Sequence, residues 1–236
     1  MNIAAQKPTR AVQTGLAISL LTLVAGAWLV LRWWYPQAFW NASGLLDIAP
    51  YALLAHLGIT VLLLLPWRNR SKEPGIARSD AALLVFVMLC AALFSLSYLF
   101  AGRPVALVFA VDRVALVRAN EVRTSELALV GTFGENLRIS GPLKLIGARQ
   151  SSDAERLDSI QLAMAGFDLH QRPGFWVPLD AQRDLLKQKS RDIGELAGFY
   201  KTQAKWATFL PLAGGNGNWV LLLDSELKTF APFKID

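Results

Sequence analysis

The sequence has little of the chemistry from which catalytic and metal sites are usually built. It contains one cysteine, Cys90, and two histidines in 236 residues. A single thiol excludes an internal disulfide and a multi-cysteine zinc site. It also lacks a nucleophile elbow, a phosphate-binding loop, an H-E-x-x-H helix and a dinucleotide fingerprint. We therefore expect no enzyme, no catalytic residue, no cofactor, no metal site and no small-molecule substrate.

The two histidines lie in different settings. His170 follows Asp168 by two positions, and such a pair supplies two metal ligands where a divalent ion needs three or four. We interpret this stretch as a loop. His56 lies in an apolar run with Asp47 near its start, so both are candidate intramembrane polar residues. A hydrogen bond to a neighbouring helix is the favoured role for His56, and helix capping for Asp47.

Charged residues are also scarce, at 18%, and they are unevenly distributed. Residues 1–102 hold seven Lys/Arg and three Asp/Glu, whereas residues 103–236 hold seventeen and fifteen. This division predicts a membrane domain over 1–102 and a folded domain over 103–236. The second part has no cluster of basic residues, so the formal net charge of +6 does not indicate a nucleic-acid partner.

Three long apolar runs occupy the first part, at about 11–34, 46–67 and 80–102. Each has the roughly 20 residues that a helix needs to cross a bilayer. The loop between the second and third runs carries four Lys/Arg, which by the positive-inside rule predicts a cytoplasmic loop. We therefore expect a multi-pass inner-membrane protein in contact with lipid, with a cytoplasmic N-terminus and a periplasmic domain over 103–236. Cleavage of the first run at Ala25–Ala27 remains an alternative.

The second part alternates between strand and helix patterns. Two apolar runs flank Asp112-Arg113 and predict a pair of short strands in a sheet covered on both faces. Two further runs flank the glycine-rich stretch 214–217 and predict a hairpin, and residues 228–233 predict a closing strand. Together with two helices, these strands indicate an α+β or α/β domain.

The two helices are predicted from caps and periodicity. Ser152 and Glu155 form a capping box before the first helix, in which we expect Leu157, Ile160 and Met164 to form a buried stripe. The second helix is predicted to run from Asp180 to about residue 203.

Two segments of the second part resemble the type IV pilin accessory proteins of the TfpX/TfpZ type. The first follows the last apolar run with an R-P-V-x-x-V-F-x-x-D-R pattern, and the second is an L-P-L-x-G pattern followed by W-V-x-L-x-D. The matching residues are Arg103, Pro104, Val105, Val108, Phe109, Asp112 and Arg113, then Leu210, Pro211, Leu212, Gly214, Trp219, Val220, Leu222 and Asp224.

The resemblance implies a chaperone-like accessory factor in pilus assembly, with a type IV pilin and other inner-membrane assembly proteins as its partners. It supplies no catalytic residues. We expect partner contacts at the turn and the hairpin, through Asp112, Arg113, Gly214, Asn216 and Trp219. An alternative is an extracytoplasmic sensor or scaffold protein anchored in the membrane.

Overall fold

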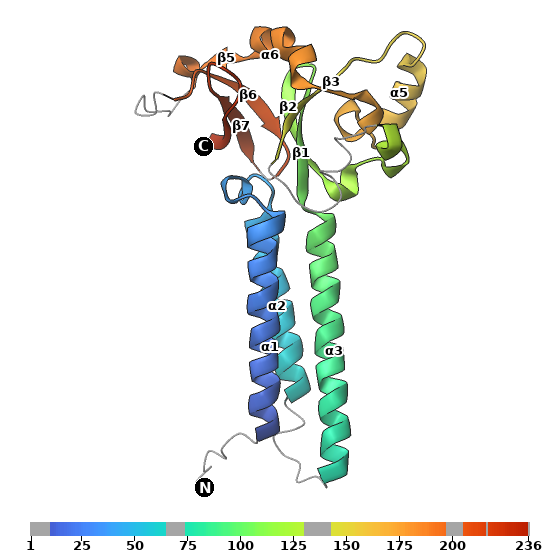
Figure 1. Cartoon of the computed structure of the whole chain (residues 1–236), viewed down its shortest axis with the longest axis vertical. Helices are drawn as coiled ribbons and strands as arrows, with labels where there is room; N and C mark the ends of the chain where they lie inside the picture. Colours follow the sequence, from blue (N-terminus) through green and yellow to red (C-terminus); the bar gives the residue numbers. More distant parts are fainter. Residues whose placement is uncertain (1–9, 65–73, 130–142, 197–204, 216, 236) are drawn as a thin grey trace. The chain divides into compact units, whose positions relative to one another are not determined.

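The computed structural model describes residues 10–64, 74–129, 143–196, 205–215 and 217–235 (Figure 1). The chain forms two compact units. Unit 1 comprises residues 1–32 and 46–100, and unit 2 comprises residues 33–45 and 101–236. The chain therefore passes between the units three times, and the short segment between the first two helices belongs to the unit that contains the sheet.

Unit 1 consists of three helices, α1 (Arg10–Leu29), α2 (Leu45–Leu64) and α3 (Pro74–Ala101), with a π-helical turn η1 (Val30–Trp34) after α1. Gly26 of α1 faces Leu96 of α3, where an added Cβ would lie 3.4 Å from the leucine Cδ2. His56 and Met88 are buried. Many large apolar side chains of these helices are nevertheless exposed, among them Leu20, Leu21, Val24, Trp28, Leu54, Phe86, Leu93 and Phe94.

The prediction of membrane-spanning helices is not upheld by the structure. Among the residues that it describes, no helix combines the length and the apolar character that a bilayer crossing requires. Polar residues enter the helices at Asp47 and His56 in α2 and at Ser95 in α3. This finding overturns the predicted fold class of three transmembrane helices followed by an extracytoplasmic domain. It likewise overturns the multi-pass inner-membrane location, including the periplasmic placement of residues 103–236.

Unit 2 is built on an eight-stranded mixed sheet with the order β4-β3-β1-β2-β6-β7-β8, in which β5 also pairs with β6. The strands are β1 (Pro104–Ala110), β2 (Arg113–Arg118), β3 (Leu145–Ala148), β4 (Trp176–Val177), β5 (Arg191–Asp192), β6 (Thr208–Ala213), β7 (Asn218–Leu223) and β8 (Phe230–Ile235). The strands predicted around Asp112-Arg113, the predicted hairpin and the closing strand are all confirmed.

The remaining elements of unit 2 are short. The helices are α5 (Arg156–Met164) and α6 (Arg183–Lys189), with 3-10 turns η2 (Gln37–Phe39), η4 (Ala119–Glu121), η5 (Thr124–Leu129), η6 (Leu169–Gln171), η7 (Pro173–Phe175), η8 (Leu179–Gln182) and η9 (Ile193–Glu195). In Figure 1, α5 lies on the β3 side of the sheet, away from β7.

Both faces of the sheet are covered, as the near-continuous apolar runs predicted. Alternate residues of β1 contribute to different cores: Leu107 and Phe109 to one, Ala106 and Val108 to the other. The first core, which also contains residues of β2, β6 and β7, is completed by Leu186 of α6. A third cluster packs Leu196 against the other face of β6 and β7.

Residues 33–45 are part of the first core, which the sequence did not predict. Phe39 and Ala42 are buried in that core, and the Phe39 ring meets the Phe230 ring edge-on at a centroid distance of 6.2 Å. Arg118 Nη2 donates to the Ser43 carbonyl oxygen over 3.1 Å. The buried side chain of Phe39 makes this connection a structural element of unit 2.

The predicted helix from Asp180 to residue 203 is wrong. It is interrupted after Lys189, because Ser190 adopts an extended conformation (φ −72°, ψ 144°) and the next two residues form β5. There Arg191 pairs with Phe209 and Asp192 with Thr208. Sheet pairing has therefore overridden the helical periodicity at this point, and the end of the predicted helix lies outside the described residues.

Candidate functional site

The turn between β1 and β2 presents two of the predicted contact residues to solvent. Asp112 N donates to the Ala110 carbonyl oxygen over 2.7 Å, and Val111 between them has a φ of 60°. A β-branched residue with positive φ is strained. Arg113 Nε donates to Asp112 Oδ1 over 2.9 Å, and both side chains are more than half exposed. This hydrogen bond lowers the pKa of the Asp112 carboxyl.

The other contacts were predicted at the β6–β7 hairpin. This hairpin packs against residues 33–45, which belong to the same unit. Gly214 and Gly215 have positive φ values of 125° and 79°. A Cβ added at Gly215 would lie 2.1 Å from the Ala42 carbonyl oxygen, so the hairpin closes directly on residues 33–45. Trp219 is partly buried against the first core, and Asn216 lies outside the described residues.

The turn and the hairpin lie at opposite ends of the sheet. β2 and β6 are parallel, with Val114 beside Leu212 and Ala115 beside Ala213. The Asp112-Arg113 turn precedes β2, whereas the Gly214-Gly215 turn follows β6. Because parallel strands run in one direction, a turn before one strand and a turn after the other project from opposite ends. The structure therefore does not bring the two groups of predicted contacts together.

The two predicted polar residues of unit 1 differ in their exposure to solvent. Asp47 is exposed in the first turn of α2, where a carboxylate interacts favourably with the helix N-terminus. His56 is buried on the same helix, two turns further along. Neither belongs to the unit that holds the turn and the hairpin.

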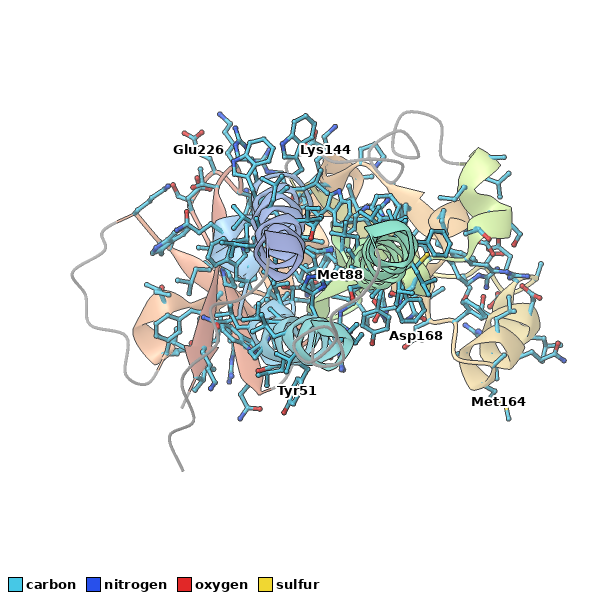
Figure 2. All side chains as sticks on the ribbon, turned by 90° about the horizontal axis from the view of Figure 1, so that it is seen from below. Tyr51, Met88, Lys144, Met164, Asp168 and Glu226 are labelled. Carbon is cyan, nitrogen blue, oxygen red and sulfur yellow. The ribbon has the colours of Figure 1, made fainter. Side chains whose placement is uncertain are left out.

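Helix α5 exposes the apolar stripe that was predicted to be buried. The exposed fractions are 75% for Leu157, 51% for Ile160 and 85% for Met164. In Figure 2 the labelled Met164 side chain projects outward from α5. No residue of α5 is buried. The prediction of a buried stripe is therefore wrong, although the three residues do share one face of the helix, at i, i+3 and i+7.

The polar face of α5 is turned toward unit 2. Arg172 Nη2 donates to Asp158 Oδ2 over 3.2 Å, and its Nη1 donates to Ser159 Oγ over 3.3 Å. Before the helix, the Arg149 guanidinium donates to both Glu155 carboxylate oxygens over 2.8 Å. Glu155 also accepts hydrogen bonds from the Ser152 N–H and hydroxyl. The bond from the N–H to the glutamate is the one that the predicted capping box requires. These contacts depress the pKa of the Glu155 carboxyl.

A buried ion pair lies beneath these contacts. Arg172 Nε donates to Glu126 Oε1 over 3.0 Å, and Arg123 Nη1 donates to the same oxygen over 3.0 Å. The Gly174 N–H donates to Glu126 Oε2 over 3.0 Å. The Arg172 and Glu126 side chains are only 8% and 11% exposed. This pair joins η5 to the loop after α5, a link across 46 residues that no local pattern signals.

Phe175 completes the support of the helix. The guanidinium carbons of Arg149 and Arg172 lie 4.4 and 4.5 Å from its ring centroid. Cations at this distance from an aromatic ring are attracted to its π face. Phe175 thus orients both arginines that contact α5, and the apolar face of the helix is left to solvent.

His170 is held in η6 near charged groups from several elements. Trp176 Nε1 donates to its carbonyl oxygen over 3.0 Å. Burial lowers the pKa of its imidazole, the carboxylates of Asp168 and Glu121 oppose that shift, and Arg113 adds to it. Among the residues that the structure describes, no group of three or more His, Cys, Asp or Glu is placed to hold a metal ion.

The lowered pKa of His170 predicts a pH dependence of stability. The unfolded imidazole has a pKa near 6.5, above the folded value, so the unfolded chain binds more protons between the two. The free energy of unfolding should therefore fall as pH drops below about 6.5, with a slope of at most about 1.4 kcal/mol per pH unit for one proton.

Urea unfolding of the full chain between pH 7.5 and 5.5 measures this slope, with His170→Asn as the comparison. The variant should lose the His170 part of the slope. Identical slopes in the two proteins would contradict the assignment.

Two curated proteins are similar to this chain over almost its whole length. The fimbrial assembly protein of serogroup I from Dichelobacter nodosus is 24% identical over 242 residues, covering 94% of this chain and 91% of the relative. The fimbrial assembly protein of serogroup E1 from the same organism is 23% identical over 239 residues, covering 93% and 91%. No family model matches the chain, and no solved structure matches it.

Proposed function

We propose that this chain is an accessory, chaperone-like factor of type IV fimbrial assembly that binds a fimbrial subunit and acts by protein–protein contact rather than catalysis. The similarity to two fimbrial assembly proteins along nearly the whole chain supports a role in that process. The resemblance of the 103–113 and 210–224 segments to pilin accessory proteins supports the pilin as the partner.

The exposed apolar stripe on α5 is the observation that supports one particular surface as the contact with the fimbrial subunit. Large apolar side chains at the same face of an exposed helix are typical of protein interaction sites. Leu157, Ile160 and Met164 form such a face, and the polar contacts of α5 hold it outward. We assign this face to the fimbrial subunit. The exposed Asp112-Arg113 turn is a second proposed contact with the same partner.

A charge placed on the stripe should weaken the contact. A lysine at position 160 or 164 would have to be desolvated against an apolar partner surface, which costs affinity. We expect Ile160→Lys and Met164→Lys to weaken binding about tenfold or more, since interface hot spots contribute at least ~2 kcal/mol. Cells that assemble fimbriae with these variants should carry correspondingly fewer surface fimbriae, counted by electron microscopy.

Ala163→Lys is the matched control. It adds the same charge to the same helix at an exposed position off the stripe. Fimbriae should remain at wild-type number with this variant, and all variants should accumulate to wild-type level. Equal loss with the control and with Met164→Lys would contradict the stripe as the contact surface, and wild-type fimbriation in a strain that lacks the gene would contradict the proposed function.

A further inference from the structure

Helix α5 is attached to unit 2 in an unusual way for a surface helix. Such helices are normally held by an apolar face packed on the core. In α5 the apolar face points outward and no residue is buried. With nine residues, the helix is also shorter than the roughly 12–15 residues at which an isolated helix becomes marginally stable in water. Its helical state therefore depends on whatever contacts hold it in place.

The described contacts that hold it are ionic or polar and lie at its N-terminal half. Glu155, Asp158 and Ser159 occupy one face at i, i+3 and i+4, and two arginines from outside the segment, Arg149 and Arg172, donate hydrogen bonds to them. The group of five residues is called the latch below. The N-terminal end of the helix is thus fixed by two arginines that belong to the body of unit 2.

The two ion pairs of the latch differ in their exposure to water. In the Asp158–Arg172 pair, Arg172 is anchored by Glu126 and is nearly buried, whereas Asp158 is 63% exposed; in the Glu155–Arg149 pair both side chains are partly exposed, at 37% and 39%. Arg172 is therefore fixed, and the other three charged groups are open to solvent and salt. Ions screen exposed charge pairs far more effectively than buried ones.

A glycine with a positive φ follows the helix. Gly166 has a φ of 92°, and a Cβ added there would meet nothing within 4 Å. Two residues later, Asp168 begins the turn that returns the chain to the body of the unit, with Asp168 N donating to Gln171 Oε1 over 2.9 Å. No side chain of α5 is fully buried, and Leu162 is only partly buried, so the segment from Ser152 to Gly166 can leave its place without removing a residue from the described core clusters.

We propose that α5 is an electrostatically latched arm, which the Glu155–Arg149 and Asp158–Arg172 contacts hold in place and which is released as a unit while the sheet stays folded. Release exposes the helix to water, where so short a helix loses its backbone hydrogen bonds. Salt screens the exposed charges of the latch and shifts the balance toward the released form. The latch is inferred from the contacts of α5 alone and does not depend on the proposed function.

Amide hydrogen exchange on the full chain tests the latch. Between 20 mM and 500 mM NaCl at constant pH, the α5 amides should exchange about tenfold faster, because exposed ion pairs are screened over this range. Two amides of this segment are convenient reporters: Ser159 N–H, bonded to the Glu155 carbonyl at 2.9 Å, and Ala165 N–H, bonded to the Gln161 carbonyl at 3.1 Å. Amides of β1 and β2 should not change.

Variants identify the groups responsible. Glu155→Gln with Asp158→Asn removes both carboxylates, and in this double variant α5 should exchange rapidly at low salt and lose its salt dependence. Asp153→Asn is the matched control, because Asp153 pairs at 3.2 Å with Arg156 of the same segment and forms no ion pair with the part of the unit's body that the structure describes. It should behave as the wild type.

The outcomes are distinct. Fast, salt-independent exchange confined to α5 in the double variant supports the latch. Salt-insensitive α5 exchange in the wild type, or a double variant that behaves as the wild type, overturns it. Faster exchange in α5 and the strands together also overturns it, because the contacts then stabilise the whole unit rather than an arm. An intact latch together with wild-type fimbriation in a strain that lacks the gene would count against the proposed function alone.

Discussion

Replacing Gly215 by alanine should lower the free energy of unfolding by about 3 kcal/mol, since a non-glycine residue at positive φ and an overpacked contact each cost about 1–3 kcal/mol. The added Cβ would lie 2.1 Å from the Ala42 carbonyl oxygen, a backbone atom that cannot rotate away. Relief requires the hairpin and residues 33–45 to separate, which removes Phe39 from the first core. Urea unfolding of the purified full chain measures the effect.

Gly166→Ala separates the two causes of that loss. Gly166 also has positive φ, at 92°, but open space surrounds its Cβ position. This variant should lose only the conformational part, about 1 kcal/mol. If Gly215→Ala costs no more than Gly166→Ala, the close approach to Ala42 does not exist in solution, and residues 33–45 are not seated on the hairpin.

Breaking the buried ion pair should have an effect of similar size. Arg172→Met leaves the Glu126 carboxylate with Arg123 and the Gly174 N–H but without its buried cation, so the loss should lie near the lower end of the about 3–5 kcal/mol that an uncompensated buried charge costs. The same change removes the cation from one side of Phe175 and the anchor of Asp158. Its effect should therefore appear in global unfolding, measured by urea titration.

Lys228→Met is the control for this prediction. Lys228 pairs with Glu226 at 2.7 Å, but both side chains are largely exposed, so the loss should be within about 1 kcal/mol. Combining Arg172→Met with Glu126→Leu should recover part of the stability, because the largely buried carboxylate that has lost Arg172 is then absent. Equal small losses for Arg172→Met and Lys228→Met would contradict a structural role for the buried pair.

Local sequence patterns were sufficient where strands pair with their neighbours along the chain. The apolar runs on either side of Asp112-Arg113 and of the glycine-rich stretch 214–217 predicted β1, β2, β6 and β7 correctly, and their lack of polar alternation predicted a sheet covered on both faces. The resemblance to pilin accessory proteins also pointed toward the fimbrial assembly proteins that the chain matches.

Local sequence patterns could not predict which face of α5 is exposed as the candidate site. Periodicity placed Leu157, Ile160 and Met164 on one face of α5, but it carries no information on which face points inward. That choice is made by Arg172, whose own position depends on Glu126 46 residues earlier. The seating of residues 33–45 on the hairpin likewise joins segments more than 170 residues apart. Apolar runs alone also led to the prediction of transmembrane helices that the described residues do not support.

The most direct test of the account is the affinity between the purified full chain and the purified fimbrial subunit, measured for the wild type and for two lysine variants. The wild type should bind saturably, Ile160→Lys should weaken binding at least tenfold, and Ala163→Lys should leave it unchanged. An affinity that is the same for all three proteins, or no binding by the wild type, would contradict the claim that this chain acts through the outward face of α5.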